Sequence, residues 1–153
     1  MARLSDLPEA LRPHIEKLPC PSFDTTPWVD GPPLKQRRVA LVSTAGLMRR
    51  GDRPFRPGAS DYRVIAGDTP AAALLLSHIS TNFDRSGFEQ DVNVMLPLDR
   101  LRELEAAGEI GAVADFHYSF MGATDPVQME DTARHLAGLM KAEGVDACLL
   151  LPV

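Results

Sequence analysis

The chain has 153 residues, of which 44% are hydrophobic and 24% charged, a composition typical of one globular domain. The formal net charge of −5 at pH 7 disfavours a nucleic-acid partner. The apolar runs are far shorter than the roughly 20 residues of a membrane-spanning helix, and the N-terminus lacks the pattern of a secretory signal, so we expect a cytoplasmic protein with no membrane partner.

The first 33 residues are predicted to form a proline-rich arm, because seven of the 13 prolines lie there. Leucine and isoleucine at positions 4, 7, 11, 15 and 18 recur at helical spacing and indicate a short amphipathic helix within the arm. Trp28, the only tryptophan, is expected to anchor the arm to the domain or to a neighbouring subunit.

Residues 34–153 are predicted to form a single layered α/β domain with a mostly parallel sheet and helices on both faces. The segment Arg49–Gly58 holds four arginines with glycine and proline and is expected to be an irregular loop. Helices are expected from Pro97 to Gly108 and from Asp125 to Gly144. Strands are expected at 39–43, 62–66, 74–79, 110–114 and 145–151.

The two cysteines indicate neither a disulfide framework nor a structural zinc site, since they lie far apart and outside any CxxC motif. Cys148 is expected to be buried in the last strand, and Cys20 to lie in a loop. The last strand, 145–151, is expected to be interior, with its end opening onto a crevice.

Ligand sites in open α/β sheets lie beyond the carboxyl ends of the strands. Ser43–Gly46 follow the first strand, and their hydroxyls and unhindered backbone could hold an anionic group. An ordinary turn is the alternative. Neither a Walker phosphate loop nor a dinucleotide-binding fingerprint is present.

The segment 77–93 is polar although apolar runs flank it. His78 could act as a general acid or base oriented by Asp84 or Asp91. The same groups could instead bind a divalent metal together with His117. A third interpretation is structural, with the aspartates as turn and cap residues and the histidine hydrogen-bonded within the fold.

His117, Tyr118 and Ser119 are consecutive and follow a weak strand. Neighbouring side chains on a strand point to opposite faces, so the three cannot reach one substrate unless the chain turns there. No GxSxG motif surrounds Ser119, which disfavours a serine hydrolase.

Six strings together resemble the glycine/sarcosine/betaine/D-proline reductase selenoprotein B family. They span roughly three quarters of the chain. The strings are RVALVSTAGL (38–47), RGDRPF (50–55), YRVIAGD (62–68), FDRSGFEQDVNVMLPLDRLREL (83–104), HYSFMG (117–122) and GVDACLLLPV (144–153).

The resemblance implies reductive cleavage of a C–N bond, with a selenocysteine or cysteine placed directly after the last apolar strand and a carbonyl group on a sister subunit. This sequence stops at Val153, so we expect either a truncated or processed piece of a longer reductase-like protein or a diverged member. Polar positions that match the family strings are predicted to be catalytic at His78, Asp84, His117 and Tyr118. Substrate binding is predicted at Thr44, Gly46, Asp91 and Asn93.

The leading hypothesis is an oxidoreductase, or a subunit of one, that acts on a small amine-type substrate in amino-acid metabolism. Its expected partners are the small-molecule substrate and either further copies of the chain or a sister reductase subunit. The alternatives are a non-catalytic ligand-binding or assembly subunit, and a metal-dependent lyase or hydrolase that uses the histidines and carboxylates. The sequence identifies no cofactor and leaves metal binding open.

Overall fold

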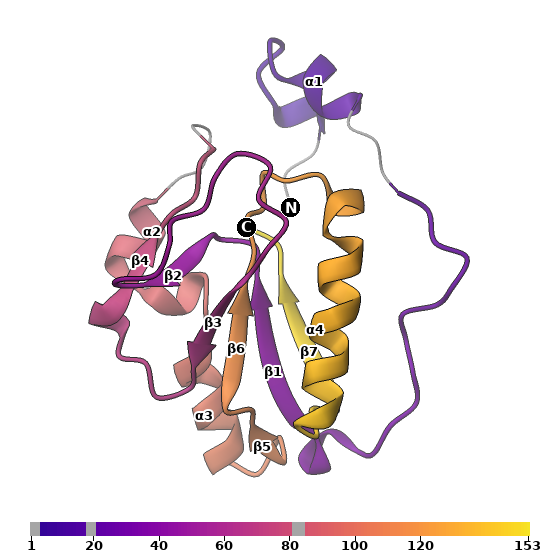
Figure 1. Cartoon of the computed structure of the whole chain (residues 1–153), viewed down its shortest axis with the longest axis vertical. Helices are drawn as coiled ribbons and strands as arrows, with labels where there is room; N and C mark the ends of the chain where they lie inside the picture. Colours follow the sequence, from indigo (N-terminus) through magenta and orange to yellow (C-terminus); the bar gives the residue numbers. More distant parts are fainter. Residues whose placement is uncertain (1–3, 18–20, 81–84) are drawn as a thin grey trace.

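The computed structural model describes residues 4–17, 21–80 and 85–153 (Figure 1). Strand β1 (Arg38–Ser43) lies at the centre of a five-stranded sheet. It pairs in parallel with β5 (Ala112–Val113) and β6 (Phe116–Ser119) along one edge, and with β7 (Ala147–Leu151) along the other. The outer strand β3 (Arg63–Ala66) is antiparallel to β6. The predicted mixed α/β architecture with a mostly parallel sheet is confirmed.

The apolar run of β1 is continuous because each of its faces supports a separate core. Val39 and Leu41 pack in the cluster that contains α3 (Leu98–Ala106). Ala40 and Val42 pack in the cluster that contains α4 (Glu130–Ala142). A helix therefore packs against each face of the sheet, as predicted.

The predicted helix after Asp125 begins as a 3-10 turn, η5 (Pro126–Met129), and continues as α4. The Asp125 carboxylate accepts a hydrogen bond from the Val127 amide, and Gly144 ends the segment with a φ of +72°. Leu136 and Met140 are buried, whereas Ala133 and Ala137 are exposed although they recur at the same helical spacing. Among the described residues, no helix is long and apolar enough to cross a membrane.

The predicted strand 74–79 does not join the main sheet. Its first residues form β4 (Leu74–Leu76), which pairs with β2 (Leu47–Arg49) in a separate antiparallel ribbon. Gly46 turns the chain out of the main sheet with a φ of +67°, so β2 starts where a loop was expected. The connecting segments contain short elements: η2 (Leu34–Gln36), η3 (Ala71–Ala73), α2 (Ser86–Gln90) and η4 (Val92–Val94).

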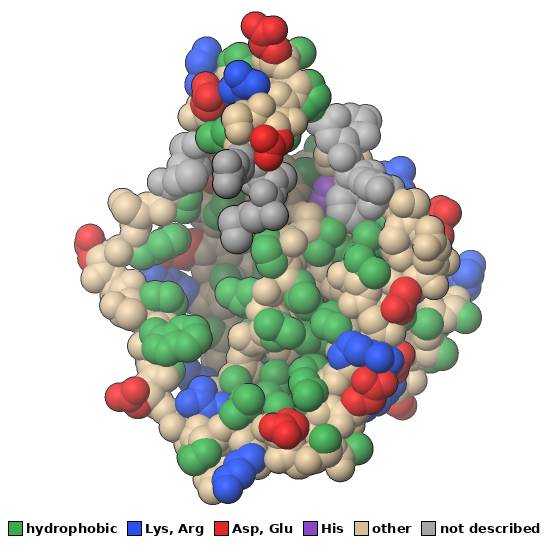
Figure 2. All heavy atoms as spheres, turned by 180° about the vertical axis from the view of Figure 1, so that it is seen from behind, with side chains coloured by type: hydrophobic (Ala, Val, Ile, Leu, Met, Phe, Trp, Pro, Cys, Tyr) green, Lys and Arg blue, Asp and Glu red, His purple; other side chains and the backbone are tan. Residues whose placement is uncertain are grey.

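The last strand is not interior, contrary to the prediction. Among the described residues β7 pairs with β1 alone, so its outer edge has no strand neighbour. Cys148 is exposed, and Leu149 and Leu150 are 43% and 68% exposed. The side of the sheet opposite α4 carries hydrophobic side chains across its centre (Figure 2).

The segment before β1 contributes no side chain to either core among its described residues. It contains η1 (Leu4–Asp6) and α1 (Arg12–Glu16), which lie away from the sheet (Figure 1). Trp28 is 86% exposed, so the predicted anchoring of this tryptophan to its own domain is wrong. Its contact with a neighbouring subunit stays a prediction.

Truncating one side chain on β1 and one on β7 should show that the core contributes more to the free energy of unfolding than the exposed edge strand does. Leu41→Ala should lower the free energy of unfolding by about 2–5 kcal/mol, because Leu41 is fully buried on the central strand. Leu150→Ala, the matched control on β7, should change the free energy by no more than about 0.5 kcal/mol. Urea unfolding monitored by circular dichroism measures both. An equal cost at both positions would show that the outer side of β7 is covered in solution.

Candidate functional site

The loops that follow β1, β6 and β7 meet at the carboxyl edge of the sheet. The Thr44 amide donates to the Leu151 carbonyl at 3.0 Å, and the Gly122 amide donates to the Thr44 carbonyl at 2.8 Å. The Thr44 hydroxyl accepts a hydrogen bond from the Val153 amide at 2.8 Å. The end of β7 is therefore fixed beside the loop after β1, where the sequence placed a crevice.

Two glycines allow this close approach. A Cβ on Gly122 would lie 2.8 Å from the Thr44 carbonyl oxygen and 2.9 Å from that of Val153. A Cβ on Gly46 would lie 3.1 Å from backbone atoms of His78. Gly46 is buried and forms a packing contact between the loop after β1 and His78. Its role in substrate binding stays a prediction.

His78 is the predicted catalytic side chain that lies at this edge. It follows β4, is 6% exposed, and its Nδ1 accepts a hydrogen bond from the Ser80 amide at 3.2 Å. Burial, and then the Arg85 guanidinium, lowers the pKa of His78 below its ordinary value. The imidazole is therefore neutral near pH 7, the form that can accept a proton.

His117 lies toward the opposite end of the sheet. Its Nδ1 accepts a hydrogen bond from the Leu41 amide at 3.1 Å. Its Nε2 has no hydrogen-bond partner among the described residues and lies beside Gly67. Gly67 follows β3, which is antiparallel to β6, so it lies at the amino edge of the parallel strands. The structure thus does not bring His78 and His117 into one crevice. Burial lowers the pKa of His117 to about 4.

Tyr118 and Ser119 project to opposite faces of β6 and have structural partners. The Tyr118 hydroxyl donates to the Glu143 carboxylate at 3.3 Å on the α4 side, and burial raises its pKa to about 12. The Ser119 hydroxyl accepts a hydrogen bond from the Leu47 amide at 2.8 Å. The alternation expected for a strand is confirmed, and Tyr118 faces away from His117.

Asp91 caps the 3-10 turn η4, and the Asn93 side chain binds the first turn of α3. The Asp91 carboxylate accepts hydrogen bonds from the backbone and the side-chain amide of Asn93, both at 2.9 Å, and these bonds lower its pKa. The Asn93 carbonyl oxygen accepts a hydrogen bond from the Asp99 amide at 3.1 Å. This geometry matches the structural interpretation of these residues. Their role in substrate binding stays a prediction.

The predicted cluster of histidines and carboxylates is not assembled within the described part of the chain. Asp84, and Cys20 with its predicted loop, lie outside the described residues. Among those described, no group of three or more His, Cys, Asp or Glu side chains lies close enough to hold a metal ion.

Cys148 is exposed rather than buried as predicted, because β7 is an edge strand. Neighbouring protein atoms partly desolvate its sulfur and raise the pKa of the thiol to about 11. The thiol is therefore protonated near neutral pH and is a poor nucleophile.

An arginine-lined hollow was missed at the sequence level. Arg53, Arg56 and Arg63 border a hollow of about 280 Å³ formed by the loop between β2 and β3. The signal was present, since four arginines in ten residues are unusual in a chain of net charge −5. Glycine and proline interrupt the run, so the pattern predicts a loop and does not specify a site.

Comparisons with known proteins identify the relatives of this chain. The family model for glycine/sarcosine/betaine reductase selenoprotein B matches residues 11–152. The chain is 37% identical over 120 residues to D-proline reductase subunit gamma of Acetoanaerobium sticklandii, an alignment that covers 76% of this chain and 49% of that protein. It is 32% identical over 142 residues to glycine reductase complex component B subunit gamma of Carboxydothermus hydrogenoformans, covering 88% of this chain and 32% of that protein.

A further relative is the betaine reductase complex component B subunit beta of Peptoclostridium acidaminophilum, 28% identical over 122 residues, with 76% of this chain and 28% of that protein covered. This chain therefore spans about half the length of the D-proline reductase subunit and about a third of the length of the other two. No solved structure gives a significant match.

The low pKa of His117 predicts a loss of stability in acid. The unfolded chain binds this proton below a pKa of 6.5, whereas the folded chain binds it only near 4. His117 should therefore contribute about 3 kcal/mol that is present above pH 6.5 and lost as the pH falls toward 4.

Urea unfolding of wild type and His117→Asn at pH 7.5 and 4.5 tests this contribution, with His135→Asn at an exposed position as the matched control. The difference between wild type and His117→Asn should shrink at pH 4.5. An unchanged difference would contradict the burial of a neutral imidazole.

Proposed function

Because this chain belongs to the glycine/sarcosine/betaine reductase selenoprotein B family, we propose that it forms part of a substrate-specific subunit of an amino-acid reductase complex. The reaction is a thiol- or selenol-dependent reductive cleavage of a C–N bond in a small amine-type substrate. The observation that carries this proposal is the match of the family model to residues 11–152, nearly the whole chain. Relatives named as subunits of D-proline, glycine and betaine reductases support it.

The carboxyl edge of the sheet is the proposed substrate site. Thr44 and Gly122 hold the end of β7 against the loops that follow the other parallel strands. The attacking selenol or thiol of this family is expected directly after the last apolar strand, a position that adjoins these loops in this fold. Catalytic groups of α/β sheets commonly lie just beyond strand ends, which supports the same placement.

The overall chemistry requires two electrons and two protons. The C–N bond breaks, the carbon gains a hydrogen, the nitrogen leaves as an amine with one proton, and a dithiol becomes a disulfide. We assign His78 the role of accepting the proton of the attacking selenol or thiol, because this imidazole is buried, neutral and at the same edge as Thr44.

One observation favours a second function for this chain by itself, as a ligand-binding or assembly subunit without a nucleophile of its own. The pKa of about 11 for Cys148 leaves its thiol protonated, and its position within β7 differs from the position after the strand that the family implies. The two functions differ in whether turnover requires other subunits.

Reconstitution distinguishes them. The tagged 153-residue chain should show no turnover of D-proline, glycine, sarcosine or betaine with dithiothreitol, and should retain other reductase subunits from an extract of its source cells, identified by mass spectrometry. The retained complex should cleave at least one substrate, measured as released or ring-opened amine. Turnover by the chain alone would refute the placement of the nucleophile. If the chain retains no reductase subunit and the recovered material cleaves no substrate, the proposed function is refuted.

Within an active complex, His78→Gln should lower kcat by about 100-fold or more, the usual contribution of a general base. His135→Gln, at an exposed position on α4, is the matched control and should leave kcat unchanged. An equal fall in kcat in both variants, or no fall in His78→Gln, would show that His78 does not accept this proton.

A further inference from the structure

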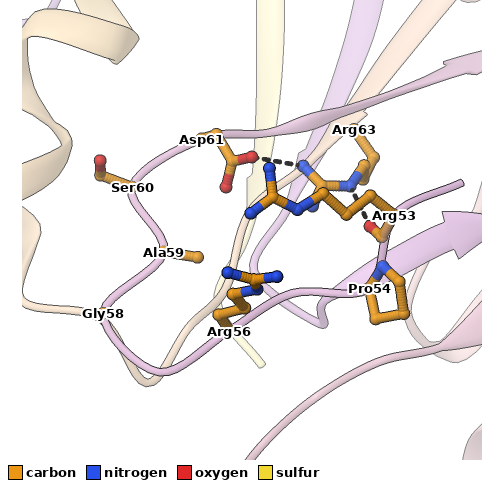
Figure 3. A pocket seen from close by; sticks show the side chains of 8 residues that line it. All are labelled: Arg53, Pro54, Arg56, Gly58, Ala59, Ser60, Asp61 and Arg63. Carbon is orange, nitrogen blue, oxygen red and sulfur yellow. Dashed lines mark hydrogen bonds and ion pairs between the residues drawn. The ribbon is translucent and has the colours of Figure 1, made fainter.

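The loop between β2 and β3 surrounds an open hollow of about 280 Å³. In Figure 3 the side chains of Arg53, Arg56, Asp61 and Arg63 point into the space enclosed by this loop, with Ser60 at its side. The lining is mainly cationic, in a chain whose net charge is −5.

Arg63 is held in place. Its guanidinium donates to the Asp61 carboxylate at 2.8 Å and to the Arg53 carbonyl at 2.8 Å, and it lies 4.2 Å from the centre of the Phe55 ring. The side chain is only 11% exposed. Arg63 thus forms a fixed wall whose charge Asp61 balances.

Arg53 and Arg56 are different. Within the part of the chain that the structure describes, neither guanidinium makes a side-chain hydrogen bond or ion pair. Three arginines against one aspartate leave a local charge of 3 − 1 = +2 around the hollow. Unbalanced guanidinium groups that face one space create a favourable potential for an anion.

The backbone of the loop is fixed before any ligand binds. The Thr124 hydroxyl donates to the Ala59 carbonyl at 2.8 Å, and the Phe55 amide donates to the Ser77 hydroxyl at 3.0 Å. The Phe55 side chain is 5% exposed and anchors the loop to the core. A site fixed in this way loses little entropy when it binds a ligand.

The hollow also borders the candidate site. Arg63 begins β3 and pairs with Ser119, the last residue of β6, so the hollow lies toward the carboxyl edge of the sheet. Thr124, which holds the loop, lies two residues after Gly122, whose amide donates to the Thr44 carbonyl. One end of a small molecule in the hollow can therefore face the loops after β1 and β6.

We propose that this hollow binds the carboxylate of a small amino-acid-type substrate, with Arg53 and Arg56 as the carboxylate ligands and Arg63 as the wall that orients them. Planar guanidinium groups bind carboxylate oxygens through paired hydrogen bonds. The identity of the molecule as a reductase substrate rests on the proposed function, whereas the binding of a carboxylate rests on the arginines.

The test is an NMR titration of the full 153-residue chain at low ionic strength, observing the arginine Nε–H signals. D-proline, sarcosine and betaine should shift the signals of Arg53 and Arg56 saturably, and D-prolinamide, which lacks the carboxylate, should not. Arg53→Gln and Arg56→Gln should each raise Kd at least tenfold. Arg134→Gln, at an arginine exposed on α4 and paired with Glu130, should change Kd by less than twofold.

Inorganic phosphate is the competing small oxyanion. Phosphate binding at least tenfold tighter than every carboxylate, with the same dependence on Arg53 and Arg56, would overturn the carboxylate assignment. The absence of any saturable shift, or equal loss of binding in Arg134→Gln, would overturn the site. Circular dichroism melting of each variant shows that the fold is retained.

The outcomes separate this site from the proposed reaction. Arginine-dependent carboxylate binding without turnover in the reconstituted complex would support the site and refute the reductase function. Turnover with an unchanged KM in Arg56→Gln would support the function and refute the site.

Discussion

Hydrogen bonding along both edges of β1 holds the two halves of the molecule together. Residues 112–119 pair with one edge and β7 with the other, so the central strand links segments more than 100 positions apart. Its side chains alternate between the two cores, which places α3 and α4 on opposite faces. The parallel arrangement then brings the loops after β1, β6 and β7 to one edge, where Thr44 and Gly122 make backbone contacts.

The same central strand explains why His117, which was predicted to be catalytic, does not lie at the carboxyl edge. Between β5 and β6 the ladder along β1 is interrupted, and the Leu41 amide donates to the imidazole of His117 instead of to a carbonyl. A buried backbone amide without a partner costs free energy, so a neutral histidine at this position completes the sheet. Asp91 and Asn93 likewise have structural partners, since Asp91 caps η4 and Asn93 accepts a hydrogen bond from the Asp99 amide in the first turn of α3.

The loop between β2 and β3 shows the opposite case, in which charged side chains do not help to hold the fold together. Its backbone and Phe55 are held by ordinary contacts, and Arg63 is neutralised by Asp61, yet Arg53 and Arg56 have no side-chain partner among the described residues. Charged side chains that the fold does not use, arranged on a fixed loop beside the carboxyl edge, are available to a ligand. This edge therefore combines the predicted position of the reacting group with a cationic surface.

The sequence by itself determined the mixed α/β class, one helix within 97–108, one within 125–144, the first strand at 39–43 and the family, because these depend on local periodicity, caps and long matching strings. Only the tertiary structure decided which polar residues meet. It placed His78 beside Gly46, His117 within the sheet and Tyr118 on the other face, and it placed β7 at the edge with Cys148 exposed. Strand order and the partners of buried amides arise from contacts between distant segments, and the one-dimensional pattern of residue types does not specify them.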